Sequence, residues 1–419
     1  MKSASVELTG KTIEINVGNA IYGGSFVGKI EDGKAVFVPF VLPGERARVL
    51  VTDEKKNFAR GTLVELLQPS PARITPRCPH FGECGGCHYQ HLPYSRQLEI
   101  KRSVVLEQFA RIGKFIDPAV KEVTPSPDEW NYRNTVQFHV AKSGKLGFQK
   151  SSSSDTIEVT QCHLPQQPIL DLWPQLDLDP ELQIERVSMR VGSDGEVVVG
   201  LEGELAEPPD FSLDFPLSVV LLAQDRDLVL SGEPTSRFMV RGDEFIVSAR
   251  SFFQVNLGQA EAMIEHVLGL VDFSNDMTVF DLYCGAGLFS RFVAPLVKEL
   301  VGVEFSESAC NDFAANMDAF DNTSLYVGAV EEILPGLDSK PDAVILDPPR
   351  AGVAPRALQA LVKASPKHIV YVSCDPTTLA RDCRALVDGG YRLESIQPFD
   401  LFPQTYHVET VVLLRRNEP

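Results

Sequence analysis

Hydrophobic and polar residues alternate in short runs near the start of the chain. Between residues 11 and 67 these runs are TIEINV, SFVGKI, AVFVPFVL, RARVLV and ARGTLVELL, with glycines and a Pro-Gly pair between them. Alternation with a period of two predicts β-strands that bury one face. Short strands at this spacing are typical of a small barrel, so we expect a β-barrel domain over residues 1–68.

Basic side chains are frequent on the predicted strands and turns of this barrel. Small barrels often bind RNA, and a basic face would favour that role. An ordinary solvated surface explains these residues equally well. They are Lys29, Lys34, Arg46, Arg48, Lys55, Lys56 and Arg60.

The middle of the chain combines one helical pattern with many strand patterns. Apolar residues recur at helical spacing from Tyr94 to Ile112, whereas residues 130–245 contain mostly short apolar runs and turns. The sequence SSSSD at 151–155 has the composition of a disordered segment, and Pro, Asp and Glu at 205–215 indicate a loop. We expect a β-rich central domain over residues 69–245.

Helix and strand patterns alternate from about residue 256 onward. The expected strands include TVFDLY, ELVGVEF, AVILD and HIVYVS, and the expected helices include AEAMIEHVLGLV, SACNDFAANMDAF, ALQALVKA and LARDCRALVDGG. Such alternation predicts a doubly wound α/β domain, which we place at residues 246–419.

The composition is that of a soluble globular protein, with 44% apolar and 23% charged residues. No apolar run approaches the ~18 residues of a membrane span, and the N-terminus lacks the apolar stretch of a secretory signal. Eight cysteines at irregular spacing favour reduced thiols, metal ligands or catalysis over a disulfide framework. We expect a cytoplasmic monomer that contacts no membrane.

The net charge of −18 is unevenly distributed. Residues 1–150 carry 21 Lys and Arg against 15 Asp and Glu, a net charge of +6, and the remainder carries 18 against 42, a net charge of −24. Phosphate binding depends on local rather than total charge. The first third of the chain is therefore compatible with an RNA or DNA partner.

Residues 278–290, TVFDLYCGAGLFS, predict a strand, a glycine loop and a helix. Gly285 and Gly287 allow the backbone to approach a ligand, and Glu304 ends the next strand, where a carboxylate can accept hydrogen bonds from ribose hydroxyls. The loop lacks the third glycine of a dinucleotide fingerprint, and Asp281 precedes it. This combination favours S-adenosylmethionine over NAD and predicts a class I (Rossmann-like) methyltransferase domain.

Residues 343–352, AVILDPPRAG, place Asp347 at a strand end and two prolines in the loop over the predicted pocket. An acidic residue, two prolines and an aromatic residue are familiar from enzymes that methylate exocyclic amino groups. Here the fourth residue is Arg350. Its presence argues against an amine as the target.

Cys374 follows the predicted strand HIVYVS, at the carboxyl end where open α/β sheets bind ligands. Taken alone, it could simply fill a strand end. A thiol is useful for methylation of uracil, because thiolate addition at C6 makes C5 nucleophilic, after which a base must remove the C5 proton. Glu409 begins the otherwise apolar strand ETVVLL, and a buried carboxylate is costly unless it is paired or functional.

Five motifs, SFFQVN, DLYCGAG, DPPRAG, SCDPTTLARD and HVET, resemble those of the bacterial RNA uracil-C5 (5-methyluridine) methyltransferases. The resemblance covers nearly the whole chain, because the N-terminal barrel looks like the TRAM domain that many members carry. It implies that Cys374 is the nucleophile and Glu409 the base. Phe252 would lie near a flipped base, or alternatively in the core. The residues implied to contact the methyl donor or hold the uracil are Gln254, Tyr283, Glu304 and Asp347.

The chain departs from this family pattern at two positions. Leu288 follows the glycine loop where members often have Asn, and Ala329 stands where they often have Asn or Asp. We therefore expect the donor contacts at these positions to be missing or supplied by the backbone.

Three cysteines lie close together in CPHFGECGGC, and a fourth follows in VTQCHLP. Four thiolates can hold a tetrahedral zinc ion or an iron–sulfur cluster, and four nearby histidines leave a Cys3His zinc site open; they are His80, His88, His91 and His163. The run resembles the 4Fe–4S segment of part of the family. That resemblance implies a cluster on Cys78, Cys84, Cys87 and Cys162. The remaining cysteines fit small buried residues, namely Cys284, Cys310 and Cys383.

Two other functions stay open. A methyltransferase that acts on an amino group or a small molecule would have no use for Cys374 and Glu409. A non-catalytic iron–sulfur protein that binds RNA or senses redox state would leave the donor motifs unexplained. Both ribosomal RNA and tRNA remain possible substrates, although the TRAM-like barrel and the cysteine segment favour ribosomal RNA.

Overall fold

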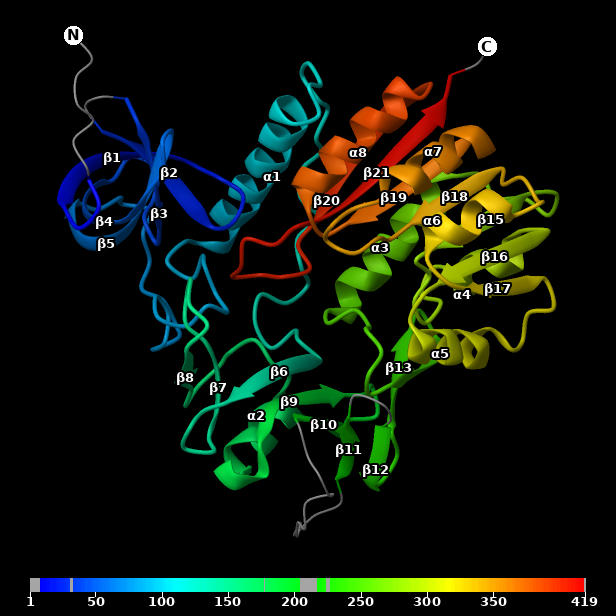
Figure 1. Ribbon diagram of the computed structural model, residues 1–419, viewed down its shortest axis with the longest axis horizontal. Helices are drawn as coiled ribbons and strands as arrows, with labels where there is room; N and C mark the ends of the chain where they lie inside the picture. Colours follow the sequence, from blue (N-terminus) through cyan, green and yellow to red (C-terminus); the bar gives the residue numbers. More distant parts are fainter. Residues whose placement is uncertain (1–7, 31–32, 177, 204–216, 224–226, 418–419) are drawn as a thin grey trace.

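A barrel, a central β-sheet and an α/β domain follow one another along the chain (Figure 1). The computed structural model describes residues 8–30, 33–176, 178–203, 217–223 and 227–417. None of the helices in these ranges combines the length and the apolar character that crossing a membrane requires. The doubly wound α/β domain, the N-terminal barrel and the β-rich middle predicted from the sequence are confirmed.

The barrel closes in the order β1-β2-β3-β5-β4. Residues at alternate positions point inward and are buried, for example Ile15, Phe26 and Val36, because the side-chain period of a strand is two. Its strands are β1 Thr12–Ala20, β2 Ser25–Lys29, β3 Ala35–Pro39, β4 Arg46–Glu54 and β5 Phe58–Gln68.

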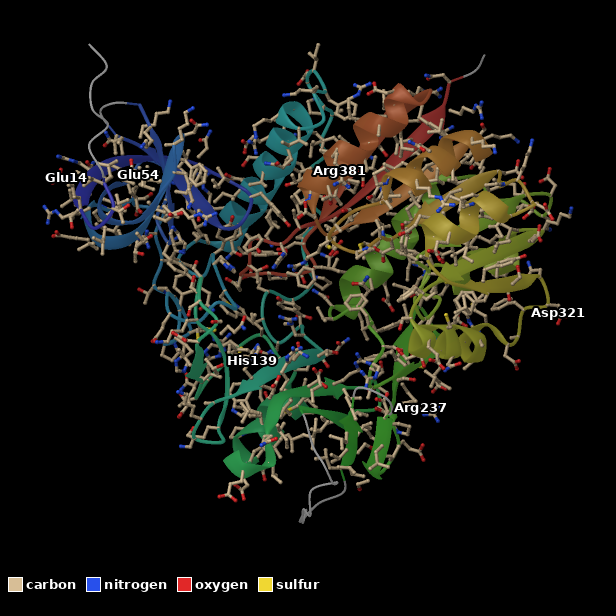
Figure 2. All side chains as sticks on the ribbon, in the orientation of Figure 1. Glu14, Glu54, His139, Arg237, Asp321 and Arg381 are labelled. Carbon is tan, nitrogen blue, oxygen red and sulfur yellow. The ribbon has the colours of Figure 1, made fainter. Side chains whose placement is uncertain are left out.

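Several of the basic side chains on the barrel have acidic partners on the same barrel, among them Glu14 and Glu54, which are labelled in Figure 2. Arg46 and Arg48 pair with Glu14, at 2.6 and 3.4 Å. Lys34 forms an ion pair with Glu54. A paired cation offers less net charge to a phosphate, so the expected basic face is weaker than the sequence suggests.

Helix α1, Tyr94–Arg111, joins the barrel to the α/β domain. Val104 packs into the barrel core, whereas Val105 and Phe109 pack into the core of the α/β domain. Because these positions lie on adjacent faces of one helix, α1 contributes to two cores at once. The helix thereby links the N-terminal barrel to the part of the chain that holds the predicted site.

The central sheet has the strand order β12-β11-β10-β9-β6-β7-β8 over the described residues. Helix α2, Gln167–Leu172, leads into Trp173, whose ring packs edge-on against Phe138 at 5.0 Å between centroids. The 3₁₀ helices here are η1 Trp173–Gln175 and η2 Pro180–Leu182. The strands are β6 Thr135–Val140, β7 Leu146–Gln149, β8 Thr156–Glu158, β9 Ile184–Val191, β10 Val197–Gly203, β11 Ser218–Leu222 and β12 Asp227–Ser231.

The serine-rich segment 151–155 is a turn between β7 and β8, not a disordered stretch. The Lys150 N–H donates to the Asp155 carbonyl at 2.8 Å, and the Ser151 N–H donates to the Glu83 carbonyl at 2.8 Å. The hairpin turn thus provides hydrogen-bond partners for backbone groups of this polar segment. The loop expected at 205–215 lies outside the described residues.

A hairpin, β13 Thr235–Val240 and β14 Asp243–Ser248, leads into the α/β domain. The sheet of that domain has the order β17-β16-β15-β18-β19-β21-β20. Its strands are β15 Thr278–Leu282, β16 Glu299–Glu304, β17 Thr323–Val327, β18 Ala343–Leu346, β19 His368–Ser373, β20 Tyr391–Phe399 and β21 Glu409–Arg416.

Helices cover both faces of this sheet. Helices α3, α4 and α5 pack on one face, and α1, α6, α7 and α8 pack on the other. Their bounds are α3 Leu257–Leu270, α4 Ser290–Val293, α5 Glu307–Met317, α6 Val330–Ile333, α7 Pro355–Ala364 and α8 Pro376–Asp388, with the 3₁₀ turns η3 Ala294–Leu296 and η4 Leu334–Gly336. The order of the strands in the sheet changes direction between the neighbours β15 and β18. Ligands of such sheets bind at the carboxyl ends of the strands, beside this change of direction.

The last two strands run differently from the rest. β15 to β19 are parallel, whereas β21 is antiparallel to β19, with Ser373 opposite Thr410. β20 was not predicted from the sequence and pairs with β21, with Phe399 opposite Glu409. Because β21 is reversed, its first residue lies beside the carboxyl end of β19.

Candidate functional site

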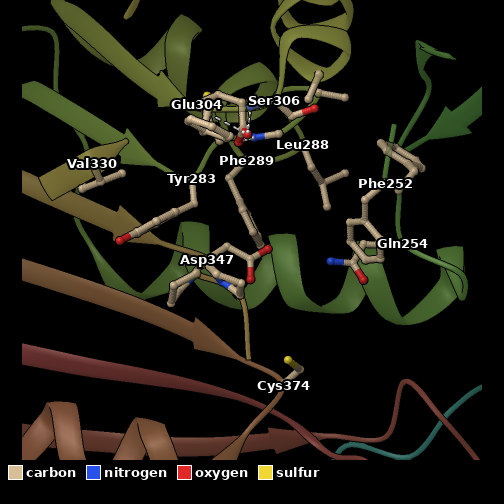
Figure 3. Close-up of a pocket in the computed structure, with 18 of the residues that line it drawn as sticks. Phe252, Gln254, Tyr283, Leu288, Phe289, Glu304, Ser306, Val330, Asp347 and Cys374 are labelled. Carbon is tan, nitrogen blue, oxygen red and sulfur yellow. Dashed lines mark hydrogen bonds between the residues drawn. The ribbon is translucent and has the colours of Figure 1, made fainter. Parts of the chain in front are cut away.

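A cavity of about 940 Å³ lies at the carboxyl ends of β15, β16, β18 and β19. In the view of Figure 3, Glu304 and Cys374 lie toward opposite ends of it, with Asp347 between them. The structure brings together all the residues predicted for catalysis and donor binding. The cavity is lined by Gln254, Tyr283, Glu304, Asp347, Cys374 and Glu409.

The glycine loop after β15 has a tightly turned backbone. Tyr283, Gly285 and Gly287 have φ angles of 65°, 53° and 90°, in the left-handed region that favours glycine. A Cβ atom added to Gly287 would lie 3.2 Å from the ring of Phe313, so the loop packs closely on α5. A change at Gly287 would disturb both the backbone conformation and this packing.

The Glu304 carboxylate ties that loop to the end of β16. It accepts hydrogen bonds from the backbone N–H groups of Gly285 at 2.9 Å, Phe305 at 2.9 Å and Ser306 at 2.8 Å. A carboxylate has about four lone-pair positions, so these bonds leave capacity for a ligand hydroxyl. Phe305 is 76% exposed beside it on the cavity wall and offers an aromatic face.

Three acidic side chains lie in or behind the wall of the cavity: Asp347 and Glu304 line it, and Asp281 is buried behind it. Burial, and then the charges of Asp281 and Glu304, raise the pKa of Asp347 to about 7. Burial raises the pKa of Asp281 to about 6, although its Oδ2 accepts a hydrogen bond from the Ser290 hydroxyl at 2.6 Å. A cationic ligand would relieve this repulsion, so the cavity favours positive charge.

Cys374 stands between β19 and α8, where the backbone is firmly held. The Asp375 side chain caps α8 by accepting hydrogen bonds from the N–H groups of Thr377 at 2.8 Å and Thr378 at 3.0 Å. The thiol is partly buried, and burial followed by the charge of Glu409 raises its pKa to about 12. The thiol is therefore protonated at neutral pH.

Glu409 is 6% exposed at the first position of β21. Burial, and then the charge of Asp347, raise the pKa of its carboxyl to about 8. The guanidinium of Arg350 acts in the opposite direction on both Glu409 and Cys374. A pKa within about one unit of neutral pH suits a proton-transfer group.

Arg350 is the site residue whose role sequence reasoning missed. In the sequence it counts only as a residue that is not aromatic, yet it lines the cavity near the thiol and the buried carboxyl. One Arg350 nitrogen lies 3.4 Å from each ring nitrogen of His407, two residues before Glu409. The sequence signal that could have indicated this role is a basic residue directly after Asp-Pro-Pro, in the loop over the predicted pocket.

The three other residues singled out in the sequence also line the cavity. Phe252 is 70% exposed and lines the cavity, so the alternative that it belongs to the core is wrong. Leu288 and Ala329 also line the cavity, and neither side chain can donate or accept a hydrogen bond. Polar contacts at these two positions must come from the backbone.

A second, smaller cavity of about 180 Å³ is lined by all four predicted ligand cysteines, which are Cys78, Cys84, Cys87 and Cys162. Burial is the main cause that raises the pKa of each thiol, and for Cys162 the value is about 11. The Gly86 N–H donates to the Cys84 sulfur at 3.4 Å. The loop thus presents both thiols and backbone donors to the cavity.

Among the described residues, no three His, Cys, Asp or Glu side chains converge closely enough to hold a single metal ion. His80 and His163 line the small cavity, but His88 packs against Tyr406 and His91 against Phe81. A zinc ion needs its ligands at ~2.3 Å from one point. An iron–sulfur cluster instead spreads its cysteines around a cube and needs a cavity between them.

The chain matches two family models. Residues 212–417 match the model described as tRNA (Uracil-5-)-methyltransferase, and residues 7–64 match the TRAM domain. The second match covers the barrel, so the TRAM-like barrel inferred from the sequence is confirmed.

The chain also resembles full-length proteins. Proteins of Halalkalibacterium halodurans and Clostridium tetani, each described as an uncharacterized RNA methyltransferase, are 33% and 32% identical to it, over 96% and 98% of both chains. The crystal structure of the Pyrococcus abyssi tRNA (uracil-54, C5)-methyltransferase in complex with S-adenosyl-L-homocysteine matches with a TM-score of 0.73 and 26% identity, over 96% of this chain and 100% of that one. The chain belongs to the RNA methyltransferase family described as tRNA (uracil-5-)-methyltransferase, in a form that carries an N-terminal TRAM domain.

Proposed function

We propose that this protein transfers a methyl group from S-adenosylmethionine to C5 of a uridine in RNA, through a covalent bond between Cys374 and C6. One observation carries the proposal: a thiol and a buried carboxyl of raised pKa share one cavity with a glycine loop suited to an adenosine. The antiparallel pairing of β21 with β19 supports it further, because Ser373 opposite Thr410 brings Cys374 and Glu409 side by side.

In the first step, the Cys374 thiolate adds to C6, and the C5–C6 electron pair moves to form an enolate at O4. The thiol proton passes to solvent. Arg350, whose charge favours the ionised form of Cys374, would also stabilise the negative charge of the enolate. S-adenosylmethionine, when bound, supplies the methyl group that the C5 carbon accepts.

In the second step, Glu409 removes the proton from C5. The electrons of the broken C–H bond form the C5–C6 double bond, and the Cys374 thiolate leaves from C6. Only the ionised carboxylate can accept this proton, and the pKa of about 8 makes that form more populated as the pH rises through 8. The products are 5-methyluridine, the demethylated donor and one proton on Glu409.

For donor binding we assign the glycine loop, Glu304 and Asp347. Glu304 retains a lone-pair position for a ribose hydroxyl, and the exposed Phe305 ring could cover the adenine. The acidic side chains in and behind the cavity wall suit the sulfonium charge of the donor. The S-adenosyl-L-homocysteine complex of the Pyrococcus abyssi enzyme supports this assignment.

Substitution of Glu304 by alanine is expected to weaken S-adenosylmethionine binding by about 1.5–3 kcal/mol, because hydrogen bonds to a charged group are lost. The same change releases three backbone N–H groups of the glycine loop. Isothermal titration calorimetry measures the effect, with Glu299→Ala at the start of β16 as a control on the same strand. Equal affinities of the Glu304→Ala and unaltered proteins would place the ribose elsewhere.

The affinity for S-adenosylmethionine is expected to fall about tenfold between pH 8 and pH 6. Asp347 has a raised pKa of about 7, and a cationic ligand binds better to its ionised form, which is lost as the pH drops. S-adenosylhomocysteine, which lacks the sulfonium charge, should lose less affinity over this range. Calorimetry on both ligands tests this, and Asp347→Asn should remove the difference between them. Parallel losses for the two ligands would contradict it.

The RNA substrate is tested with unmodified transcripts of tRNA and of large-subunit ribosomal RNA. The TRAM domain and the cysteine segment led us to favour ribosomal RNA, whereas the family description and the Pyrococcus abyssi relative name tRNA. Mass spectrometry of each transcript after incubation with enzyme and S-adenosylmethionine should reveal 5-methyluridine in one of them. Mapping of cellular RNA from a deletion strain identifies the same uridine. Methylation of a base other than uracil would refute the proposed function.

We also propose that a 4Fe–4S cluster is held by Cys78, Cys84, Cys87 and Cys162. The four thiols surround one cavity instead of converging on one point, an arrangement that favours a cluster over a single zinc ion. A cluster there would cross-link the loop 78–87 to the end of the central sheet.

Anaerobically purified protein is expected to be brown, with a broad absorbance near 400 nm. Cys84→Ala should remove this absorbance because one of the four ligands is lost. Cys310→Ala, which alters a buried cysteine of α5 outside the small cavity, should retain it. Colourless protein with one zinc ion per chain, measured by metal analysis, would refute the cluster.

A further inference from the structure

Residues 400–408 form a strap between β20 and β21 that ends at Glu409. In Figure 1 it is the red loop that reaches from the α/β domain toward the barrel. Its ends are anchored by apolar side chains, since Leu401 and Val408 are fully buried in the cores on opposite faces of the sheet. The strap is thus a defined part of the interior, although it has no regular secondary structure.

Two glutamines lock the middle of the strap to helix α1. The Gln97 side-chain amide donates to Gln404 Oε1 at 2.9 Å, and the Gln404 backbone N–H donates to Gln97 Oε1 at 3.0 Å. The exposed fractions of Gln97 and Gln404 are 1% and 2%. Loss of one partner would leave buried polar groups unsatisfied.

Gln404 also holds the strap against the two residues that follow the cysteine run 78–87. Its carbonyl accepts hydrogen bonds from the backbone N–H groups of His88 at 2.8 Å and Tyr89 at 3.0 Å. Its φ of 70° is uncommon for a residue other than glycine and persists only when the surroundings enforce it. The bonds to Gln97, His88 and Tyr89 supply that enforcement.

We propose that Gln97 and Gln404 are positioning residues that aim the Glu409 carboxylate at the C5 proton of the methylated adduct. The inference rests on the proposed function and adds two residues that do not line the catalytic cavity. Glu409 opens β21, and the strap leads directly into it. The base must lie within hydrogen-bond reach of the proton that it removes. A small displacement of the Glu409 carboxylate would therefore slow this step.

The nucleophile is held mainly by elements outside this lock. The Tyr22 hydroxyl donates to the Cys374 carbonyl at 3.4 Å, and the Tyr22 ring packs edge-on against Tyr406 of the strap. Cys374 itself follows the central strand β19 and precedes the helix cap made by Asp375, and the hydrogen bonds between Gln97 and Gln404 do not involve that turn. A loosened strap should therefore slow proton removal and leave thiol addition largely intact. A general loss of structure would slow both steps together.

The test uses Gln97→Met, which keeps the volume of the side chain and removes its hydrogen bonds to the strap. The full-length enzyme is mixed with S-adenosylmethionine and the transcript that the unaltered enzyme methylates. Denaturing gels then follow the formation and decay of the protein–RNA adduct in one turnover. Adduct formation should stay within about threefold of normal, and its decay should slow about ten- to a hundredfold.

Gln404→Leu removes the bond that Gln404 Oε1 accepts from Gln97, and it keeps the backbone bonds of Gln404 to Gln97, His88 and Tyr89. Its decay should be slowed less than that of Gln97→Met, and the double variant should be no slower than Gln97→Met, because Gln97 takes part in both bonds of the lock. Leu106→Ala, an exposed change on the same helix, should decay normally.

Normal adduct decay in both glutamine variants, or equal slowing of formation and decay, would overturn the lock. If one variant is insoluble, the other still tests the proposal. If both are insoluble, the pair is required for folding and the proposed positioning role is refuted. Glu409→Gln, run alongside, sets the limit for a missing base. If that variant forms no lasting adduct, the proposed chemistry fails and not merely the positioning.

Discussion

Glu409→Gln is expected to leave the enzyme joined to its RNA after a single methyl transfer. Glutamine keeps the size of the side chain but cannot accept the C5 proton at neutral pH. Without that step the C5–C6 double bond cannot re-form, and the bond from Cys374 to C6 cannot break. Methyl label from the donor should therefore appear in a protein–RNA complex that survives denaturing gels, and turnover should fall by at least about a thousandfold.

Cys374→Ala is the matched comparison. It should give neither turnover nor a covalent complex, while RNA binding stays within a few-fold, because a partly buried thiol adds little to a polyanion interface. The Cys374→Ala, Glu409→Gln double variant should behave like Cys374→Ala, since a base cannot matter when addition never occurs.

Two results would change the mechanism. Normal turnover by Glu409→Gln would mean that another base, or water, removes the C5 proton. A stable adduct formed by Cys374→Ala would assign the nucleophile to a different cysteine, of which Cys284 also lines the cavity.

Lys101→Met is expected to lower the stability of the protein by about 3–5 kcal/mol. Lys101 of α1 and Asp400 of the strap form a fully buried ion pair, at 2.5 Å between Nζ and Oδ1. The same ammonium donates to the Phe402 carbonyl at 3.0 Å. With methionine at position 101, the Asp400 carboxylate would be buried without a cation beside it. The free-energy cost of removing this carboxylate from water would then no longer be offset by the attraction of the ammonium.

Differential scanning calorimetry compares the unfolding temperatures of this variant and two controls. Arg96→Ala breaks an exposed pair with Glu99 on the same helix and should have little effect, since exposed pairs contribute about 0–1 kcal/mol. The double variant Lys101→Met, Asp400→Leu removes both charges and should recover most of the loss. An unchanged unfolding temperature for Lys101→Met would mean that water reaches the Asp400 carboxylate.

Local sequence pattern was enough to predict most elements of the fold. The helical spacing predicted from Tyr94 to Ile112 appears as α1, Tyr94–Arg111, because amphipathic periodicity is a property of neighbouring residues. The reversal of strand order beside β15 follows from βαβ topology, so residues at the ends of parallel strands share one edge. For this reason the sequence alone could propose that Glu304, Asp347 and Cys374 meet.

β20 escaped prediction because its pattern is broken. The register between β20 and β21 shifts between Leu393 and Ser395, and such a bulge interrupts the period of two on which strand prediction depends. Likewise, the charges of Arg46 and Arg48 are read from the sequence, but their pairing with Glu14 depends on which strands are neighbours.

The sequence by itself determined the chemical groups of this protein: a thiol at a strand end, a glycine loop, a carboxylate opening an apolar strand and a cluster of cysteines. Only the tertiary structure decided where Glu409 lies. The antiparallel course of β21 brings its carboxyl near Cys374, burial raises its pKa to about 8, and Gln97 hydrogen-bonds to the strap that leads into it. These features depend on pairing and burial between residues far apart in the chain, and no local pattern carries that information.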